Sequence, residues 1–251
     1  MIFLSFIFGL IWGSFLSVVK NRLDRPKTIF FGRSECPKCK KKLGPVDLIP
    51  LVSFIIFRGK CRYCKKKISP EYPLFELISA AMAGALYLKF GLSLASIFLF
   101  LSLSVLLIAS FIDISDHEVD LGLFIAGIIL ALAWFFLKDE GIRTFTGLLL
   151  AVLYGAILPF GLYLASREKW MGLGDSFFAV WVAAIAGFPE VIAAIFLAFF
   201  SGAFFGIITL LIKKNRKDRK LPFGPFLALG GFLAVLWGDR IVSFYLQFFG
   251  I

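Results

Sequence analysis

The chain has 251 residues, of which 60% are hydrophobic and 17% aromatic, and its mean hydropathy is +0.91. Soluble domains average roughly 45–50% apolar residues, so this composition excludes an ordinary soluble protein and indicates an integral membrane protein. The net charge is +11. Because the basic residues lie in loops between apolar runs, the charge favours a membrane-topology signal over a nucleic-acid-binding surface, and no nucleic-acid partner is expected.

The first apolar run, 1–19, is long enough to cross a hydrocarbon core of about 30 Å. It has neither the basic start nor the A-x-A cleavage site of a signal peptide, so we expect a retained transmembrane helix. In this helix Gly13 and Ser14 would let another helix approach closely. The polar segment from Lys20 to Tyr72 follows, with 15 of the 27 Lys and Arg residues and only four acids. This excess of positive charge predicts a cytoplasmic location.

Seven further apolar runs predict an all-α polytopic fold with about eight transmembrane helices in a lipid bilayer. They are 74–90, 94–112, 121–137, 144–165, 176–188, 191–212 and 224–248. Alternation from a cytoplasmic first loop places residues 113–120, 167–175 and 213–220 on the cytoplasmic side, where the charge is dense. We expect three parts: a first transmembrane helix (1–19), a cytoplasmic four-cysteine loop domain (20–73) and a transmembrane core (74–251).

All four cysteines lie in the first loop, as Cys36-x2-Cys39 and Cys61-x2-Cys64 separated by 21 residues. Two such turns can aim four thiolates at one point, which suits tetrahedral Zn²⁺. A pair of disulfides is the alternative, but it conflicts with a reducing cytoplasmic side. Four cysteines leave no open ligand position, so the predicted zinc is structural. The apolar stretch 48–57 is too short to span and is expected to pack against the bilayer surface or the zinc fold.

Acidic residues follow one apolar run and precede another. Asp113 directly follows the run 94–112, with Asp116 and Asp120 beyond it, and Asp175 stands just before another run, behind Gly172 and Gly174. An ionisable group at the edge of a bilayer is a functional hypothesis by default.

Two such carboxylates could act as a dyad in which one keeps a proton and the other is the base, activating a water against a peptide carbonyl. A solvated helix end is the ordinary explanation for most of the first cluster, including the sole histidine, His117. A carboxylate-dependent transporter or channel is the functional alternative for the pair.

Taken together, these motifs resemble those of the bacterial type IV prepilin peptidases, the leader peptidase/N-methyltransferases. The matching pieces in chain order are Gly13–Val19 with Asn21-Arg22, the paired cysteines, Asp47–Pro50, Gly59–Cys61, Ile68–Pro73 with Glu76, Ile112-Asp113, Gly172–Asp175 and Leu221–Pro225. Their joint order covers nearly the whole chain and is far more specific than any one of them.

The resemblance implies a multi-pass aspartic protease of the GxGD type in the bacterial inner (cytoplasmic) membrane. It would cleave the basic leader of type IV prepilins or type II secretion pseudopilins after a Gly, on the cytoplasmic face. Asp113 and Asp175 match the catalytic aspartates, and Gly172, Gly174, Asp116, Asp120 and Glu168 would support the site.

Many members of this family also methylate the new N-terminal residue with S-adenosylmethionine. That activity is associated with the cysteine loop and its neighbours. In this chain the methyl-transfer or substrate candidates are Glu76, Asn21, Arg22 and Glu71.

Two positions depart from the family pattern. Val119 stands where a Pro often precedes the last Asp of the first cluster, and Phe177 stands where a Lys often follows the GxGD aspartate. Neither change removes a catalytic carboxylate, but a nearby cation is missing at the second position.

Overall fold

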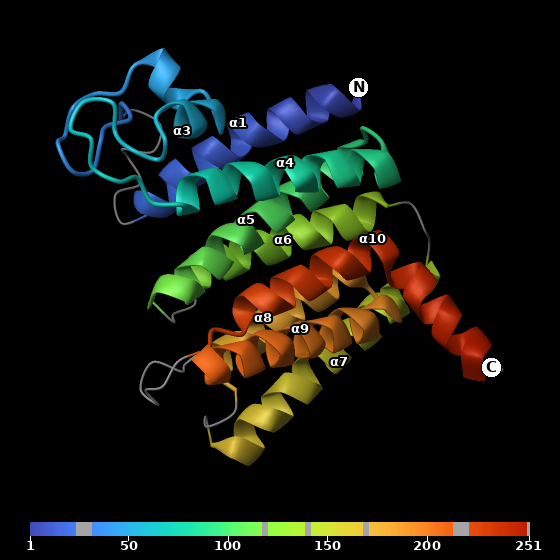
Figure 1. Cartoon of the computed structure of the whole chain (residues 1–251). Coiled ribbons are helices and arrows are strands. Elements are labelled where there is room, and N and C mark those ends of the chain that lie inside the picture. Colours follow the sequence, from blue (N-terminus) through green and yellow to red (C-terminus); the bar gives the residue numbers. More distant parts are fainter. Residues whose placement is uncertain (24–31, 117–119, 139–141, 168–170, 213–220, 250–251) are drawn as a thin grey trace. The chain divides into compact units, whose positions relative to one another are not determined.

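The structure is a computed structural model that describes residues 1–23, 32–116, 120–138, 142–167, 171–212 and 221–249 (Figure 1). Within these ranges the chain is helical, and its only β pairing is two isolated bridges in the first loop. The predicted all-α class is therefore confirmed. The chain divides into two compact units, Met1–Leu92 and Ser93–Ile251, which are described separately.

The first unit pairs helix α1 (Ile2–Asn21) with helix α4 (Glu71–Phe90), and the loop between them carries a 3₁₀ turn, η1 (Pro45–Leu48), and a short helix, α3 (Val52–Ile56). Close approach is possible because α1 presents glycines. A Cβ on Gly9 would lie 2.5 Å from the Cα of Ala80, and one on Gly13 would meet the backbone of Phe75 and Glu76. The small-xxx-small spacing is typical of helices that associate in membranes.

The described residues of the second unit form six helices, α5 to α10. Their bounds are Leu94–Asp116, Leu121–Leu137, Ile142–Ser166, Leu173–Ala186, Glu190–Ile212 and Gly224–Phe249. The predicted runs match these helices closely, although α5 continues past the predicted end at Ile112. In the described part of the chain, six helices are long and apolar enough to cross a membrane, while α6 and α8 are shorter.

The short helix α8 forms the core of the second unit. Its 14 residues correspond to about 21 Å, less than a hydrocarbon core of about 30 Å. It packs against α6, α7, α9 and α10, and Phe178, Trp181 and Val182 are fully buried. Because protein surrounds α8, it does not need the length of a lipid-exposed helix.

A buried hydrogen-bond chain joins three helices around Trp181. The indole Nε1 of Trp181 in α8 donates to Ser102 Oγ in α5 at 3.0 Å, and that hydroxyl donates to the carbonyl oxygen of Gly127 in α6 at 2.9 Å. Gly127 also makes room for the ring, because a Cβ there would overlap the indole. Burying a polar group without a partner costs several kcal/mol in a membrane protein, so this chain fixes how α5, α6 and α8 pack.

We expect Gly127→Ala to destabilise the protein, because the added methyl group overlaps the Trp181 ring and disturbs its bond to Ser102. Overpacking of this kind costs about 1–3 kcal/mol. The matched control is Gly161→Ala in α7, where a Cβ meets no atom within 4 Å. Thermal unfolding of the purified protein in detergent should show a lower midpoint for the first variant only, and equal midpoints would contradict the packing described here.

Candidate active site and metal-binding loop

Asp113 lies in the last turn of α5 and is buried, with 8% of its surface exposed. It shares one helix face with Ser102, because their 11-residue separation corresponds to three turns. Its Oδ2 accepts a hydrogen bond from the backbone N–H of Gly224 at 3.1 Å. Gly224 is the first residue of α10, so a carboxylate inside the unit faces the start of a helix.

Asp175 lies in the first turn of α8, three residues after the N-cap Gly172. The predicted apolar run began at residue 176, and the structure shows that the helix already includes the acid. The backbone N–H of Gly172 donates to Asp175 Oδ2 at 2.9 Å, and Gly174 lies within the same first turn. The helix start thus orients this second carboxylate, which is only partly exposed.

Asp113 and Asp175 lie on two helices of one unit although 62 positions separate them in the sequence. A Cβ on Gly224 would meet both Asp113 Oδ2 at 2.6 Å and the Cζ of Phe178, one turn after Asp175, at 2.9 Å, and the charge of Asp113 acts on the Asp175 carboxyl group. Asp175 is also desolvated by the protein around it. Two carboxyl groups with these surroundings do not both ionise easily. The arrangement can therefore hold one proton donor beside one base, which is the requirement for activating a water.

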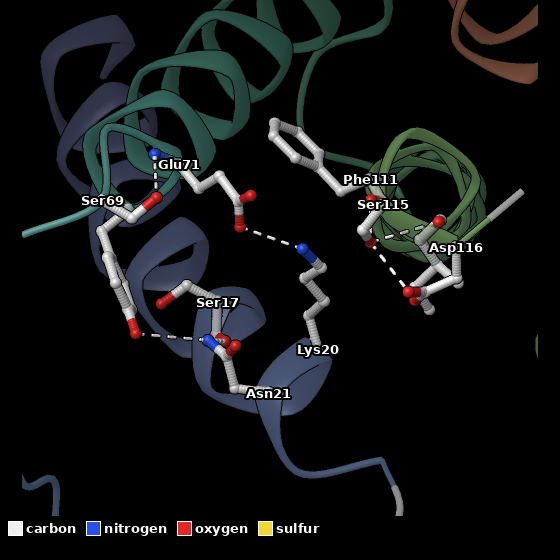
Figure 2. A network of polar contacts seen from close by, with 10 residues as sticks. Ser17, Lys20, Asn21, Ser69, Glu71, Phe111, Ser115 and Asp116 are labelled. Carbon is white, nitrogen blue, oxygen red and sulfur yellow. Dashed lines mark hydrogen bonds and ion pairs between the residues drawn. The ribbon is translucent and has the colours of Figure 1, made fainter. Parts of the chain in front are cut away.

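The other predicted supporting acids have different surroundings. Asp120 is the N-cap of α6, with Oδ1 accepting from the N–H of Leu123 at 2.9 Å. Asp116 is exposed at the end of α5, where Ser115 donates to it at 3.3 Å (Figure 2). Glu168 and His117 lie outside the described residues, as does the basic run 213–220. Of the two described acids, Asp120 therefore caps a helix and Asp116 faces outward at a helix end.

The two cysteine pairs form turns of the same shape. The backbone carbonyl of Cys36 accepts a hydrogen bond from the N–H of Lys40 at 2.8 Å. The carbonyl of Cys61 accepts the equivalent bond from the N–H of Lys65 at 2.9 Å. Both lysines adopt positive φ, 57° and 58°. Each turn closes with an isolated bridge, between residues 35 and 42 and between residues 60 and 67.

These turns aim all four sulfur atoms at one point. The Sγ atoms lie within 4.8 Å of one another, and all four thiols are free. Cys36 Sγ and Cys64 Sγ are 4.0 Å apart. In a tetrahedral site with Zn–S bonds of about 2.3 Å, neighbouring sulfur atoms are about 3.8 Å apart. The cluster therefore has the ligand set and geometry to hold a metal ion.

Electrostatics favour a cation in this cluster. Burial raises the pKa of the Cys36 thiol, but hydrogen bonds from Cys39 and Lys38 outweigh it and lower that pKa to about 7. A backbone bond from Lys41 lowers the pKa of Cys39, yet desolvation and the neighbouring sulfurs raise it to about 11. The Cys36 thiol therefore ionises readily, whereas the Cys39 thiol beside it does not. A divalent cation would remove this repulsion, because thiolates are its ligands.

Glu76 connects the loop to the helix pair of the first unit. It is buried in α4 with 8% of its surface exposed, and it accepts the backbone N–H of Leu51 at 2.7 Å and a hydrogen bond from Ser14. Leu51 precedes α3 and has a positive φ of 57°, a strained conformation for a residue with a side chain. The bond to Glu76 holds this bend, so Glu76 fixes the loop at the helix ends.

The remaining methyl-transfer candidates gather where α1 ends and α4 begins. Lys20 forms an ion pair with Glu71 at 2.9 Å, and the side-chain amide of Asn21 donates to the Ser17 carbonyl at 2.7 Å (Figure 2). Arg22 donates to the carbonyl of Arg33 at 3.0 Å. These candidates thus have local partners that join the helix ends to the loop.

Gly224 is the residue whose position sequence reasoning missed. It belongs to the segment Leu221–Pro225, which contributed to the family resemblance without any role at the site. The available signal was a glycine and a proline just before a long apolar run, which is typical of a helix start. Nothing in that pattern identifies an acid 111 residues earlier as the partner of its N–H.

Comparisons with known proteins cover the site and the loop. Residues 7–90 match the bacterial peptidase A24 N-terminal domain, and residues 100–207 match the type IV leader peptidase family. The first match includes the four cysteines and the second includes both Asp113 and Asp175. No solved structure gives a significant match.

Whole-length relatives point the same way. The chain is 34% identical over 250 residues to a prepilin leader peptidase/N-methyltransferase of Bacillus subtilis, with 98% of each chain covered. It is 31% identical to a protein of the same description from Pseudomonas aeruginosa, over 98% of this chain and 93% of the relative. A protein of the same description from Stutzerimonas stutzeri is 32% identical, over 97% of this chain and 93% of the relative. The predicted resemblance is confirmed, and the chain belongs to the prepilin leader peptidase/N-methyltransferase family.

Proposed function

We propose that this multi-pass membrane protein cleaves the basic leader of type IV prepilins or type II secretion pseudopilins after a glycine, and then methylates the new N-terminal residue. One observation carries the proteolytic half. Two carboxyl groups on helices of one unit, Asp113 and Asp175, each accept a main-chain N–H at a helix start and lie within the residues that match the type IV leader peptidase family. The descriptions of the relatives support both halves.

Proteolysis follows from a dyad with one ionised and one protonated carboxyl group. The ionised group removes a proton from a water, whose oxygen attacks the carbonyl carbon of the scissile bond, while the protonated group donates its proton to the carbonyl oxygen. The tetrahedral intermediate then collapses. The C–N bond breaks as the leaving nitrogen accepts a proton, and the dyad returns to one proton. No metal or covalent enzyme intermediate is needed.

The scissile bond of a prepilin and the proposed dyad would lie at the same depth relative to the membrane. A prepilin has an apolar helix after its basic leader, so the helix can lie among the transmembrane helices while the leader stays in the cytoplasm. We place the dyad at the cytoplasmic face of the inner membrane. The support is the charge distribution, because the 15 basic residues of 20–72 mark the cytoplasmic side. Residues 74–251 would form the peptidase core.

The methyl-transfer half is assigned to the loop domain, residues 20–73, with its neighbouring helix ends. S-adenosylmethionine is the second substrate and supplies the methyl group. The new N-terminal amine forms a bond to the methyl carbon, the C–S bond breaks, and the amine loses a proton. Glu76 would support this reaction by holding the loop through the N–H of Leu51. A structural Zn²⁺ on the four cysteines would keep the loop folded.

Asp113→Asn and Asp175→Asn should each abolish leader cleavage, because an amide cannot act as the base or share the dyad proton. Intact-mass analysis of a prepilin incubated with each inserted variant measures this. Asp116→Asn is the matched control, since Asp116 is an exposed acid one turn away, and it should cleave normally. Full activity of either dyad variant would refute the assignment, and loss of activity in the control alone would move the dyad by one turn.

The methyl-transfer half makes a separate prediction. With S-adenosylmethionine present, mass spectrometry of the cleaved pilin should show the added mass of one methyl group on the new N-terminus. The variant Glu76→Gln should reduce methylation more than cleavage, because it replaces the carboxyl group that accepts the Leu51 N–H with an amide. An unmethylated product at full cleavage by the unaltered protein would refute this second activity.

The metal site predicts one Zn²⁺ per chain when the purified protein is analysed by elemental mass spectrometry. Cys36→Ser should lose that metal, because a neutral hydroxyl is a poor replacement for a thiolate. Metal binding should also weaken steadily as the pH falls, since protons compete for the Cys39 thiolate already at neutral pH and for the Cys36 thiolate below about pH 7. Full metal content in the variant would contradict a four-cysteine site, and Lys38→Gln is the control that leaves the ligands in place.

A further inference from the structure

The backbone at the start of α10 contacts the dyad directly. The first N–H groups of a helix have no partner within that helix, and the helix dipole favours a negative group there. In this protein the N–H of Gly224 donates to Asp113 Oδ2 at 3.1 Å, across 111 residues of sequence and within the buried interior. The bond occupies one oxygen of the carboxylate and fixes the direction in which the group points.

The same residue also leaves no room for a side chain beside that carboxylate. A Cβ on Gly224 would lie 2.6 Å from Asp113 Oδ2 and 2.9 Å from the Cζ of Phe178. Phe178 is fully buried and lies one turn after Asp175 in α8. Gly224 therefore touches the carboxylate of one dyad helix and a side chain of the other, and any side chain on it would displace one of them.

The arrangement at the second acid is similar. Gly172 donates its N–H to Asp175 Oδ2, just as Gly224 does for Asp113 Oδ2. Each acid is thus held through one oxygen by the main chain of a glycine at a helix start. The difference is that Gly172 belongs to the helix of its own acid, whereas Gly224 belongs to α10, which packs against α5, α8 and α9.

We propose that Gly224 is a positioning residue of the peptidase: its N–H orients the Asp113 carboxylate, and its missing side chain lets that carboxylate stand opposite Asp175. This inference rests on the proposed proteolytic function. The reason for the effect is geometric, because two carboxyl groups must reach the same water, and a displacement of about 1 Å can lower a rate about 100-fold.

The test is steady-state cleavage of a prepilin by the full-length protein in lipid nanodiscs. Gly224→Ala should lower kcat on the order of 100-fold while KM stays close to that of the unaltered protein, because the substrate helix still binds. The matched control is Gly231→Ala in the same helix. Its Cβ would be equally crowded, 2.8 Å from Val182 Cγ1, but two turns away from the acid, so kcat should be nearly unchanged.

A second variant tests whether the effect of Gly224→Ala comes from its contact with Asp113 or from its contact with the Phe178 ring. Phe178→Leu removes the second of the two crowded contacts, so the double variant with Gly224→Ala leaves the Asp113 carboxylate as the group in conflict. We expect its kcat to stay low. Recovery of kcat would place the effect in the packing of Phe178 and overturn the inference. Where Gly224→Ala alone fails to insert, the double variant carries the test.

The remaining outcomes separate this inference from the proposed function. A near-normal kcat for Gly224→Ala, or an equal loss in Gly231→Ala, overturns the positioning role. If Asp113→Asn is inactive in the same assay, the dyad assignment survives that result. If Asp113→Asn cleaves normally, the proteolytic assignment of that acid itself fails.

Discussion

A carboxylate inside a bundle of apolar helices needs hydrogen-bond donors, and in this protein the main chain at helix starts provides them. Asp113 accepts from Gly224, and Asp175 accepts from Gly172. A side-chain donor such as Lys or Arg would bring a charge that must itself be accommodated in the interior. Backbone N–H groups avoid that cost, because they are present at every helix start and otherwise lack partners.

The helix packing brings these starts to the acids. α8 is short and packs against α6, α7, α9 and α10, and its first turn carries Asp175. Trp181 bonds to Ser102, which lies three turns before Asp113 on the same face of α5. Glycines at the crossings, including Gly127, allow the backbones and the indole to approach closely. The geometry of the two carboxyl groups therefore depends on contacts distributed over the second unit.

The first unit holds a polar loop beside two apolar helices. Two turns of the same shape gather four sulfur atoms without help from a sheet or a core. Glu76 then ties the loop to α4 through one strained backbone position, Leu51. This construction explains how a loop rich in lysine can have a defined structure: bonds at its two ends replace the hydrophobic core that its composition cannot provide.

Much of this protein could be predicted from its sequence, because the physical signals are local. Apolar runs of membrane length identify helices, the Cys-x2-Cys spacing identifies the metal-ligating turns, and acids beside apolar runs identify the candidate dyad. Of the first acidic cluster, the sequence singled out Asp113 because it directly follows an apolar run, and the structure buries Asp113 and exposes Asp116.

The partners of buried groups were decided by the tertiary structure alone. The bond between Gly224 and Asp113 and that between Leu51 and Glu76 both use a backbone N–H. Every residue except proline carries that donor, so no residue type marks which one is used. Its partner is set by how helices distant in sequence pack. The sequence by itself therefore determined which side chains are the candidates for the chemistry, because acids beside apolar runs are a local signal. The packing of α5, α8 and α10 determined how the main chain holds Asp113 and Asp175, because it brings together helices distant in sequence.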